Sequence, residues 1–327
     1  MIARINRRET IALLGGAAAW PLAARAQQPA LPVVGWLDTF TRERRRDAVA
    51  AIHAGLREIG YVEGQNIAFE YRWAEGHFDR LPSLAADLAR RQVVLIFANG
   101  AASALAAKAA TTTIPIIFIT GGDPVSLGLV SSLNRPGGNL TGFGGLVNAL
   151  GSKQLQLLRQ VAPGADAIAY LANPANPIAP ADAKDVQTAA GVLRLQVNIL
   201  NASSPSDIDL AFATIARQQL GGVLVANDPF LNSRVNQIAQ LALIHRVPTI
   251  FPHREAATVG GLMSYGPGME EPIMAVYVGR ILKGEKPGDL PIVQATKFQL
   301  VINLITVKSL GLTIPPGILA IADEVIE

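Results

Sequence analysis

Side chains that could carry out catalysis are few in this sequence, and none has the spacing that catalysis requires. The four histidines stand apart from one another and outside HExxH or other short metal-binding patterns. The stretch GLMSYG around Ser264 departs from a nucleophile elbow, because Leu262 stands where G-x-S-x-G needs glycine. There is no P-loop lysine, and TGFGGL is not a strand-to-helix G-x-G-x-x-G. We therefore expect no catalytic residue, no metal and no cofactor.

A different set of residues is suited to hydrogen bonding with a small polar molecule. Short apolar runs end abruptly in Asn, Asp, Thr and Gly, as IPIIFIT does at GGDP. Ligands of open parallel sheets bind outside the carboxyl ends of the strands, where helix N-termini expose free N–H groups. The candidate ligand-binding residues are Asp38, Thr39, Phe40, Asn99, Gly100, Ala101, Ala102, Thr120, Gly121, Asp123, Asn173, Asn176, Asn227 and Asp228.

The same residue types also make turns and helix caps, which is the competing interpretation of each loop. Pro124 and Pro229 suit a first helical turn and leave Asp123 and Asp228 as N-caps. The stretch ANGAASALAAKAAT has no bulky side chain at its start, so a ligand could approach the backbone N–H groups there. Asp123 and Asp228 could in principle act as acid and base, but nothing near them in the sequence supports a perturbed pair.

Alternating apolar runs and helical patterns place these loops at the ends of strands. In the first half we expect strands at 32–38, 66–75, 93–100, 114–120 and 139–145 and helices at 42–60, 80–92, 101–111 and 124–134. The pattern restarts in the second half, with helices at 150–163, 179–193, 205–218 and 232–246 and strands at 167–173, 195–201, 221–228 and 247–252. A tail adds a helix at 270–284, then a strand and a helix within 298–312. This is a repeated βα unit, which predicts two α/β halves with parallel sheets.

Composition is that of a large folded chain with a distinct N-terminal segment. The 327 residues are 50% hydrophobic and include no cysteine, which excludes disulfides, thiolate chemistry and cysteine-type zinc sites. Four arginines against Glu9 give residues 1–26 the whole net charge of +3. The neutral remainder offers no general attraction to nucleic acid.

The N-terminal segment, MIARINRRETIALLGGAAAWPLAARAQQ, has the three parts of a cleavable export signal, with cutting expected after Ala26. A membrane anchor is the competing interpretation, but the apolar part is about 15 residues long and is broken by Gly15, Gly16 and Pro21. Arg7 and Arg8 fit either a twin-arginine signal or an ordinary basic region. We expect a periplasmic protein.

Four stretches make the chain resemble the ABC transporter substrate-binding protein family related to tryptophan/tyrosine-binding components. They are GLREIGYVEGQNIAFEYRWAEG, AAKAATTTIPIIFITGGDPVSLGLVSSLNRPGGNLTG, GGLMSYGP and LPIVQATKFQLVINLITVKSLGLTIPP. The resemblance implies a type I periplasmic binding protein: two Rossmann-like lobes with parallel central sheets, joined by a multi-strand hinge. The expected lobes are 31–143 with 266–290, and 144–265 with 291–327, after a signal at 1–26.

The resemblance also implies a ligand site and partners. Loops matching ANGAAS and GGDP would line the first lobe, and loops matching NPAN and NDPF the second. For an amino acid, the carboxylate would lie near 99–103, and Asp228 or else Asp123 would pair its ammonium. An apolar group could stack on Phe40, Phe230 or Trp36, although Trp36 also fits a core position. ABC permease subunits would be the partners of a monomeric receptor.

Two departures from the family keep the ligand open. Ala101 stands where many members have a hydroxyl residue, and DTFTRERRR replaces a Gly/Ser-rich loop. Arg44 to Arg46 could be a solvated helix face or could contact an anionic ligand or the permease. A periplasmic sensor for a signalling partner, or an enzyme on the same scaffold, are the alternative functions. A sugar repressor is excluded, because an export leader stands where a DNA-binding helix pair would be.

Overall fold

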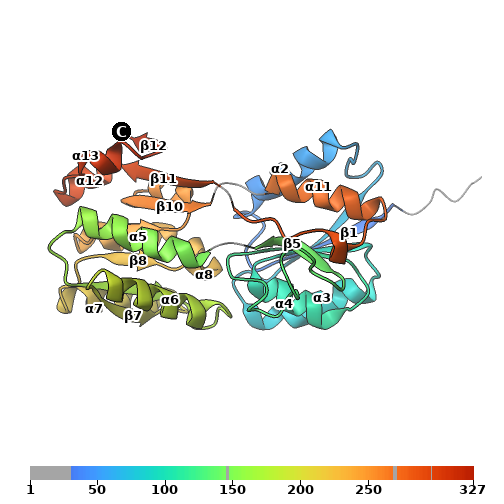
Figure 1. The fold of residues 1–327 in the computed structure, drawn as a ribbon, viewed down its shortest axis with the longest axis horizontal. Helices are drawn as coiled ribbons and strands as arrows, with labels where there is room; N and C mark the ends of the chain where they lie inside the picture. The colour runs from blue at the N-terminus through green and yellow to red at the C-terminus, as the bar shows by residue number, and fades with distance from the viewer. Residues whose placement is uncertain (1–30, 145–146, 268–270, 296) are drawn as a thin grey trace, which may run out of the picture.

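The computed structural model describes residues 31–144, 147–267, 271–295 and 297–327, so the predicted export signal lies outside the described residues. Two sheets form two lobes that lie side by side (Figure 1). The first lobe has a five-stranded parallel sheet in the order β2 (Ala68–Trp73), β1 (Val33–Asp38), β3 (Leu95–Asn99), β4 (Ile116–Thr120), β5 (Leu140–Gly144). In this order the winding direction reverses between β1 and β3, which is where ligands of doubly wound sheets bind.

Helices cover both faces of the first sheet, because its strands are apolar on both sides. Helices α2 (Arg46–Glu58) and α11 (Glu271–Leu282) lie on one face, and α3 (Leu81–Arg90) and α4 (Ala101–Ala110) on the other (Figure 1). Trp36 is fully buried in the core beneath α2, with its ring centroid 4.5 Å from that of Phe97. Trp36 is therefore a core residue and does not provide a stacking surface for a ligand.

The second lobe has a seven-stranded sheet, parallel except where β10 meets β11. Its order is β12 (Glu324–Ile326), β11 (Phe298–Asn303), β10 (Met263–Pro267), β9 (Thr249–Phe251), β8 (Val223–Val225), β6 (Ala167–Ala172), β7 (Gln196–Asn201). The longer helices are α5 (Val147–Val161), α6 (Ala179–Val192), α7 (Pro205–Arg217), α9 (Val235–Ile244) and α12 (Leu304–Leu310). Shorter helices are α8 (Pro229–Ser233), α10 (Arg254–Thr258) and α13 (Pro316–Leu319).

From residue 31 onward, the described segments alternate between the lobes, so that the chain crosses from one lobe to the other three times. It leaves the first sheet after Gly144, returns to the first lobe after Pro267, and enters the second sheet again at Phe298. Before the last passage, Ile292 packs in the core of the first lobe and the backbone of Val293 bridges to Phe143. Residues 291–295 thus lie with the first lobe in the structure.

One predicted helix, at 124–134, is wrong. The N–H of Leu127 bonds to the carbonyl of Asp123 at 3.0 Å, which begins a helical turn. Gly128 then adopts a left-handed conformation with φ of 66°, and its N–H bonds to the carbonyl of Val125. A left-handed glycine ends a helix, so the segment forms successive turns instead.

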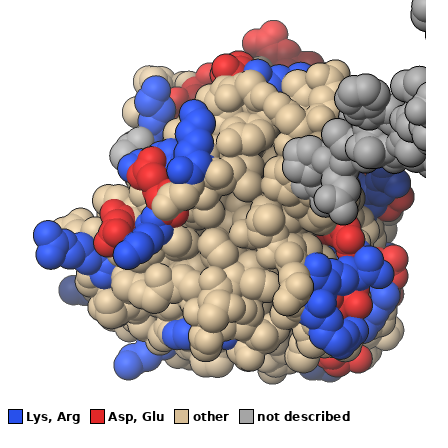
Figure 2. Space-filling model, turned by 90° about the vertical axis from the view of Figure 1, so that its right-hand side faces the viewer, with Lys and Arg blue, Asp and Glu red and all other residues tan. Residues whose placement is uncertain are grey.

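Charged side chains are mixed on the outer end of the first lobe. Figure 2 shows basic and acidic groups together around a wide uncharged area of this face. Opposite charges also pair within this lobe, where Arg72 lies 2.6 Å from Asp87 and 2.8 Å from Glu70. None of the helices in the described ranges combines the length and hydropathy that a membrane crossing needs.

Candidate ligand-binding site

The carboxyl ends of β1, β3 and β4 are neighbours, so their predicted polar residues form one rim of the first lobe. Asp38 is fully buried and accepts four hydrogen bonds: from the Trp36 indole at 3.0 Å, the Asn99 amide at 2.9 Å, the Phe40 N–H at 2.9 Å and the Arg45 guanidinium at 3.2 Å. The Arg45 guanidinium also lies 5.0 Å from the centre of the Phe40 ring. Asp38 therefore fixes the shape of this rim, with its carboxylate already satisfied.

The first turn of α4 is the part of this rim that offers unused donors. Gly100 precedes it with φ of 92°, and a side chain there would meet Thr39 Oγ1 at 2.9 Å. The first intrahelical bond runs from the N–H of Ala104 to the carbonyl of Gly100, which leaves three earlier N–H groups free of helix partners. The hydroxyl of Ser103 is buried and, among the described residues, has no hydrogen-bond partner.

The GGDP loop closes the same rim after β4. Thr120 is buried, and its hydroxyl accepts a hydrogen bond from the N–H of Gly122 at 3.1 Å. Asp123 accepts from the Ser126 hydroxyl at 2.6 Å and from the Val125 N–H at 3.0 Å, and these bonds hold the pKa of Asp123 below its ordinary value. Asp123 is thus engaged in its own turn.

In the second lobe, the ends of β6 and β8 bring three predicted residues together. Asp228 is buried and caps α8, accepting from the Leu231 N–H at 2.9 Å. The Asn176 amide donates to Asp228 at 2.9 Å and the Asn173 amide at 3.3 Å. Burial raises the pKa of Asp228, and the hydrogen bonds from Leu231, Asn176 and Asn173 oppose that rise. Both carboxylate oxygens of Asp228 therefore already accept hydrogen bonds from protein donors.

The two rims face each other and touch. A Cβ built on Gly122 would lie 2.7 Å from Cγ2 of Ile178, at the start of α6 in the second lobe. His253 follows β9, and its ring nitrogen lies 2.9 Å from the Asn227 side-chain oxygen. Burial lowers the pKa of His253, Glu255 opposes this, and Arg45 and Arg44 of the first lobe lower it further.

Most of the predicted residues lie on these two rims, and many are shielded from solvent. The structure buries Asp38, Thr39, Asn99, Ala101, Thr120, Asn173, Asn176 and Asp228. It leaves partly exposed Phe40, Gly100, Ala102, Gly121, Asp123 and Asn227.

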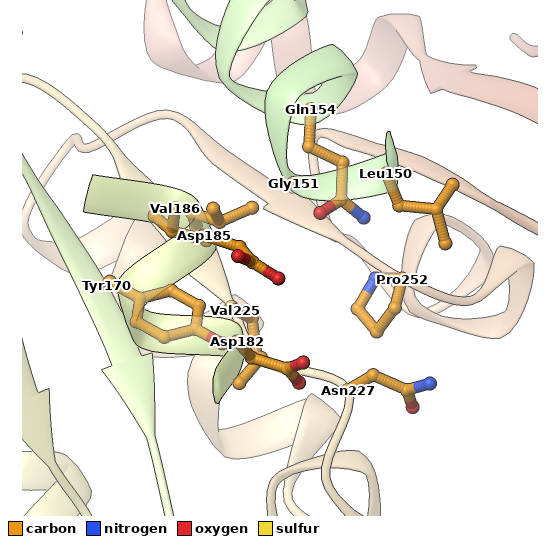
Figure 3. Close-up of a pocket in the computed structure, with 12 residues that line it drawn as sticks. Leu150, Gly151, Gln154, Tyr170, Asp182, Asp185, Val186, Val225, Asn227 and Pro252 are labelled. Carbon is orange, nitrogen blue, oxygen red and sulfur yellow. The ribbon is translucent and has the colours of Figure 1, made fainter. Parts of the chain in front are cut away.

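A recess in the second lobe adds residues that the sequence did not single out. It lies between α5 and α6 above β6 and β8, and it includes Asp182, Asp185 and Tyr170 (Figure 3). The recess shares Asn227 with the strand-end rim. Burial raises the pKa of Asp182 to about 7, and the nearby carboxylate of Asp185 adds to the rise. Acidic residues are common near the start of a helix, because the helix dipole stabilises their negative charge there. The sequence therefore held no specific signal for this recess.

Two parallel-sheet lobes that face each other across polar strand ends define a type I periplasmic binding protein. Residues 40–326 match the family model for ABC transporter substrate binding proteins, and the chain belongs to that family. It is thus the substrate-binding component of an ABC transporter, which takes a small-molecule ligand, and the family is one of receptors and not of enzymes. The predictions of fold class, family and receptor function are confirmed.

Several proteins are similar to this chain in sequence or in structure. A tyrosine-binding protein of Clostridioides difficile (strain R20291) is 26% identical over 261 residues, 79% of this chain and 74% of that protein. A conserved domain protein from Vibrio cholerae superposes with a TM-score of 0.84 at 25% identity, covering 90% of this chain and 99% of the other. An ABC domain in complex with L-Trp from Streptococcus pneumonia gives 0.83 at 22% identity, covering 91% and 100% of the two chains.

Proposed function

We propose that this receptor captures an amino acid of the tyrosine or tryptophan type between its two lobes. The observation that carries the proposal is the unpaired, buried hydroxyl of Ser103 in the first turn of α4. A buried hydroxyl without a partner is costly, and a ligand oxygen would satisfy it. The names of two relatives, a tyrosine-binding protein and an L-Trp complex, support the same ligand class.

The start of α4 suits a carboxylate. Its free N–H groups and the helix dipole favour negative charge, and Ser103 adds one more donor. Ala101 and Ala102 have small side chains, so an anion could reach the backbone. In this proposal the carboxylate hydrogen-bonds to the N–H groups of 101–103 and to the Ser103 hydroxyl. The predicted residues of the two rims surround the rest of the ligand.

Delivery would depend on closure of the lobes. Three chain passages join the lobes, and Gly122 meets Ile178 across the cleft. A ligand that contacts both rims stabilises the closed arrangement, because it binds that arrangement more tightly than the open one. We propose that the closed form of a monomer in the periplasm is what the permease subunits recognise.

A thermal-shift screen tests the ligand class. The chain is heated with amino acids, organic acids, sugars or nucleosides, and reaction mixtures are checked for products by mass spectrometry. A ligand at 100 times its dissociation constant stabilises a folded protein by about 2.7 kcal/mol, which corresponds to about 5 °C. We expect such a shift with tyrosine or tryptophan and no product. Shifts confined to sugars, nucleosides or organic acids without an amine would contradict the proposal.

A further inference from the structure

The recess between α5 and α6 is the feature of the second lobe that the strand-end rims do not explain. Asp182 and Asp185 lie three positions apart on α6, and both carboxylates point into the recess (Figure 3). In the part of the chain that the structure describes, neither carboxylate makes a hydrogen bond or an ion pair. The intervening Lys184 is exposed and is not part of the lining.

Two further side chains present polar atoms to the same space. Tyr170 is only 3% exposed, and within the described ranges its hydroxyl has no hydrogen-bond partner. The hydroxyl end of the ring points toward Asp182 in Figure 3. Gln154, from α5, donates its amide to the carbonyl of Tyr265 at 2.7 Å, which leaves its side-chain oxygen as an acceptor. The recess is therefore rich in acceptors, and none of the described residues that line it is basic.

The size of the recess limits what it can hold. Its volume is about 30 Å³, which exceeds the roughly 10–15 Å³ that one water molecule needs but is small for a large group. A primary ammonium group is a compact donor of three hydrogen bonds, whereas a guanidinium is a larger plane. Asp228, which the family resemblance implied as the ammonium partner, already accepts hydrogen bonds from Leu231, Asn173 and Asn176.

We propose that this recess holds a primary ammonium group of the ligand, with Asp182 and Asp185 as its charge partners and Tyr170 and Gln154 as further acceptors. The inference rests on the proposed function, in which the carboxylate of the same ligand lies at the start of α4. The ligand class is thereby narrowed to zwitterions with one carboxylate and one primary ammonium.

Calorimetric titration of the full chain tests the assignment. The probes are L-tyrosine, L-tryptophan and the linear ω-amino acids from glycine to 6-aminohexanoate, each paired with the analogue that lacks the amine. Tyramine and tryptamine supply the amine without the carboxylate. For the best zwitterion we expect at least tenfold weaker binding when the amine is removed. The linear series reports which separation of the two charges fits.

The variants Asp182→Asn and Asp185→Asn should weaken binding of that zwitterion at least tenfold and leave its amine-free analogue unchanged. Tyr170→Phe, which keeps the ring, should weaken binding of the zwitterion by a smaller factor. Asp166→Asn is the matched control, because Asp166 is exposed and lies at the opposite end of β6. Thermal unfolding of each variant shows whether it is folded.

The outcomes separate this inference from the proposed function. Wild-type affinity in the Asn variants, or equal affinity with and without the amine, would overturn the inference and leave an amino-acid receptor standing. Binding of tyramine or tryptamine that depends on Asp182, without binding of any zwitterion, would support the recess and refute the proposed ligand class. No binding by any probe would overturn both.

Discussion

Gly122, after β4 of the first lobe, packs directly against Ile178, which precedes α6 of the second lobe. The methyl Cγ2 of Ile178 occupies the space of a Gly122 side chain, at 2.7 Å from an ideal Cβ. The two lobes therefore meet without room for a side chain at position 122.

Gly122→Ala should hinder closure without unfolding either lobe. The added methyl overlaps a branched side chain whose Cγ2 cannot move without a change of rotamer or backbone. We expect the ligand affinity to fall roughly tenfold, which corresponds to a loss of about 1.4 kcal/mol in the free energy of the closed, ligand-bound arrangement. The thermal midpoint of the unliganded chain should stay the same. Gly164→Ala is the control, because nothing lies within 4 Å of a Cβ there. Equal affinities of the two variants would show that this contact does not limit closure.

Ser103→Ala should lose affinity and keep or gain stability. The variant removes a donor to the ligand carboxylate, which is worth about 1.5–3 kcal/mol for a charged acceptor, or roughly a tenfold to hundredfold change in dissociation constant. It also removes a buried hydroxyl that has no partner among the described residues. Ser264→Ala is the control, because Ser264 is the other hydroxyl of this kind and lies on β10, away from α4. An equal loss of affinity in both variants would count against a carboxylate at α4.

Asp228→Ala should mainly destabilise the second lobe. The change removes the cap of α8 and leaves the amides of Asn173 and Asn176 without their acceptor. Together these losses are expected to cost about 3–5 kcal/mol of unfolding free energy, measured by urea denaturation. Asp207→Ala, which removes the partly exposed acid of the capping box that Ser204 and Asp207 form at the start of α7, should cost less. An Asp228→Ala protein of unchanged stability would mean that this carboxylate is free for a ligand.

Asp182 should make stability depend on pH. Its folded-state pKa of about 7 lies above the ordinary value of 3.8, so the unfolded chain loses this proton first as the pH rises. Its contribution is thus most favourable below about pH 4, is lost as the pH rises to about 7, and is constant above that. As the pH rises from 4 to 8, the free energy of unfolding of Asp182→Asn should increase by about 2–4 kcal/mol relative to that of the wild type. Parallel pH profiles of the wild-type and Asp182→Asn proteins would contradict this prediction.

The order of elements and the polar strand-end edge could be predicted from the sequence, because both depend on local patterns. Apolar runs that end in ANGAAS or NDPF place Asn99 and Asp228 at strand ends without knowledge of any contact. The sheet order then brings Asn99 against Asp38 at 2.9 Å.

The features that could not be predicted from the sequence depend on tertiary contacts. Asp228 has the residue type that an ammonium requires, yet Asn173 and Asn176 from another loop use its oxygens. Asp182 resembles any acid near a helix start until α5 packs beside α6 and partly buries it. The helix expected at 124–134 does not form, because Gly128 adopts a left-handed backbone conformation.

The most direct test of a receptor that binds its ligand's carboxylate at α4 is a calorimetric comparison of L-tyrosine with L-tyrosinamide. The two differ only at the carboxyl group, and both keep the primary ammonium. We predict one L-tyrosine per chain and binding of the amide at least a hundredfold weaker. Equal binding of the two, or no binding of L-tyrosine, would contradict the account.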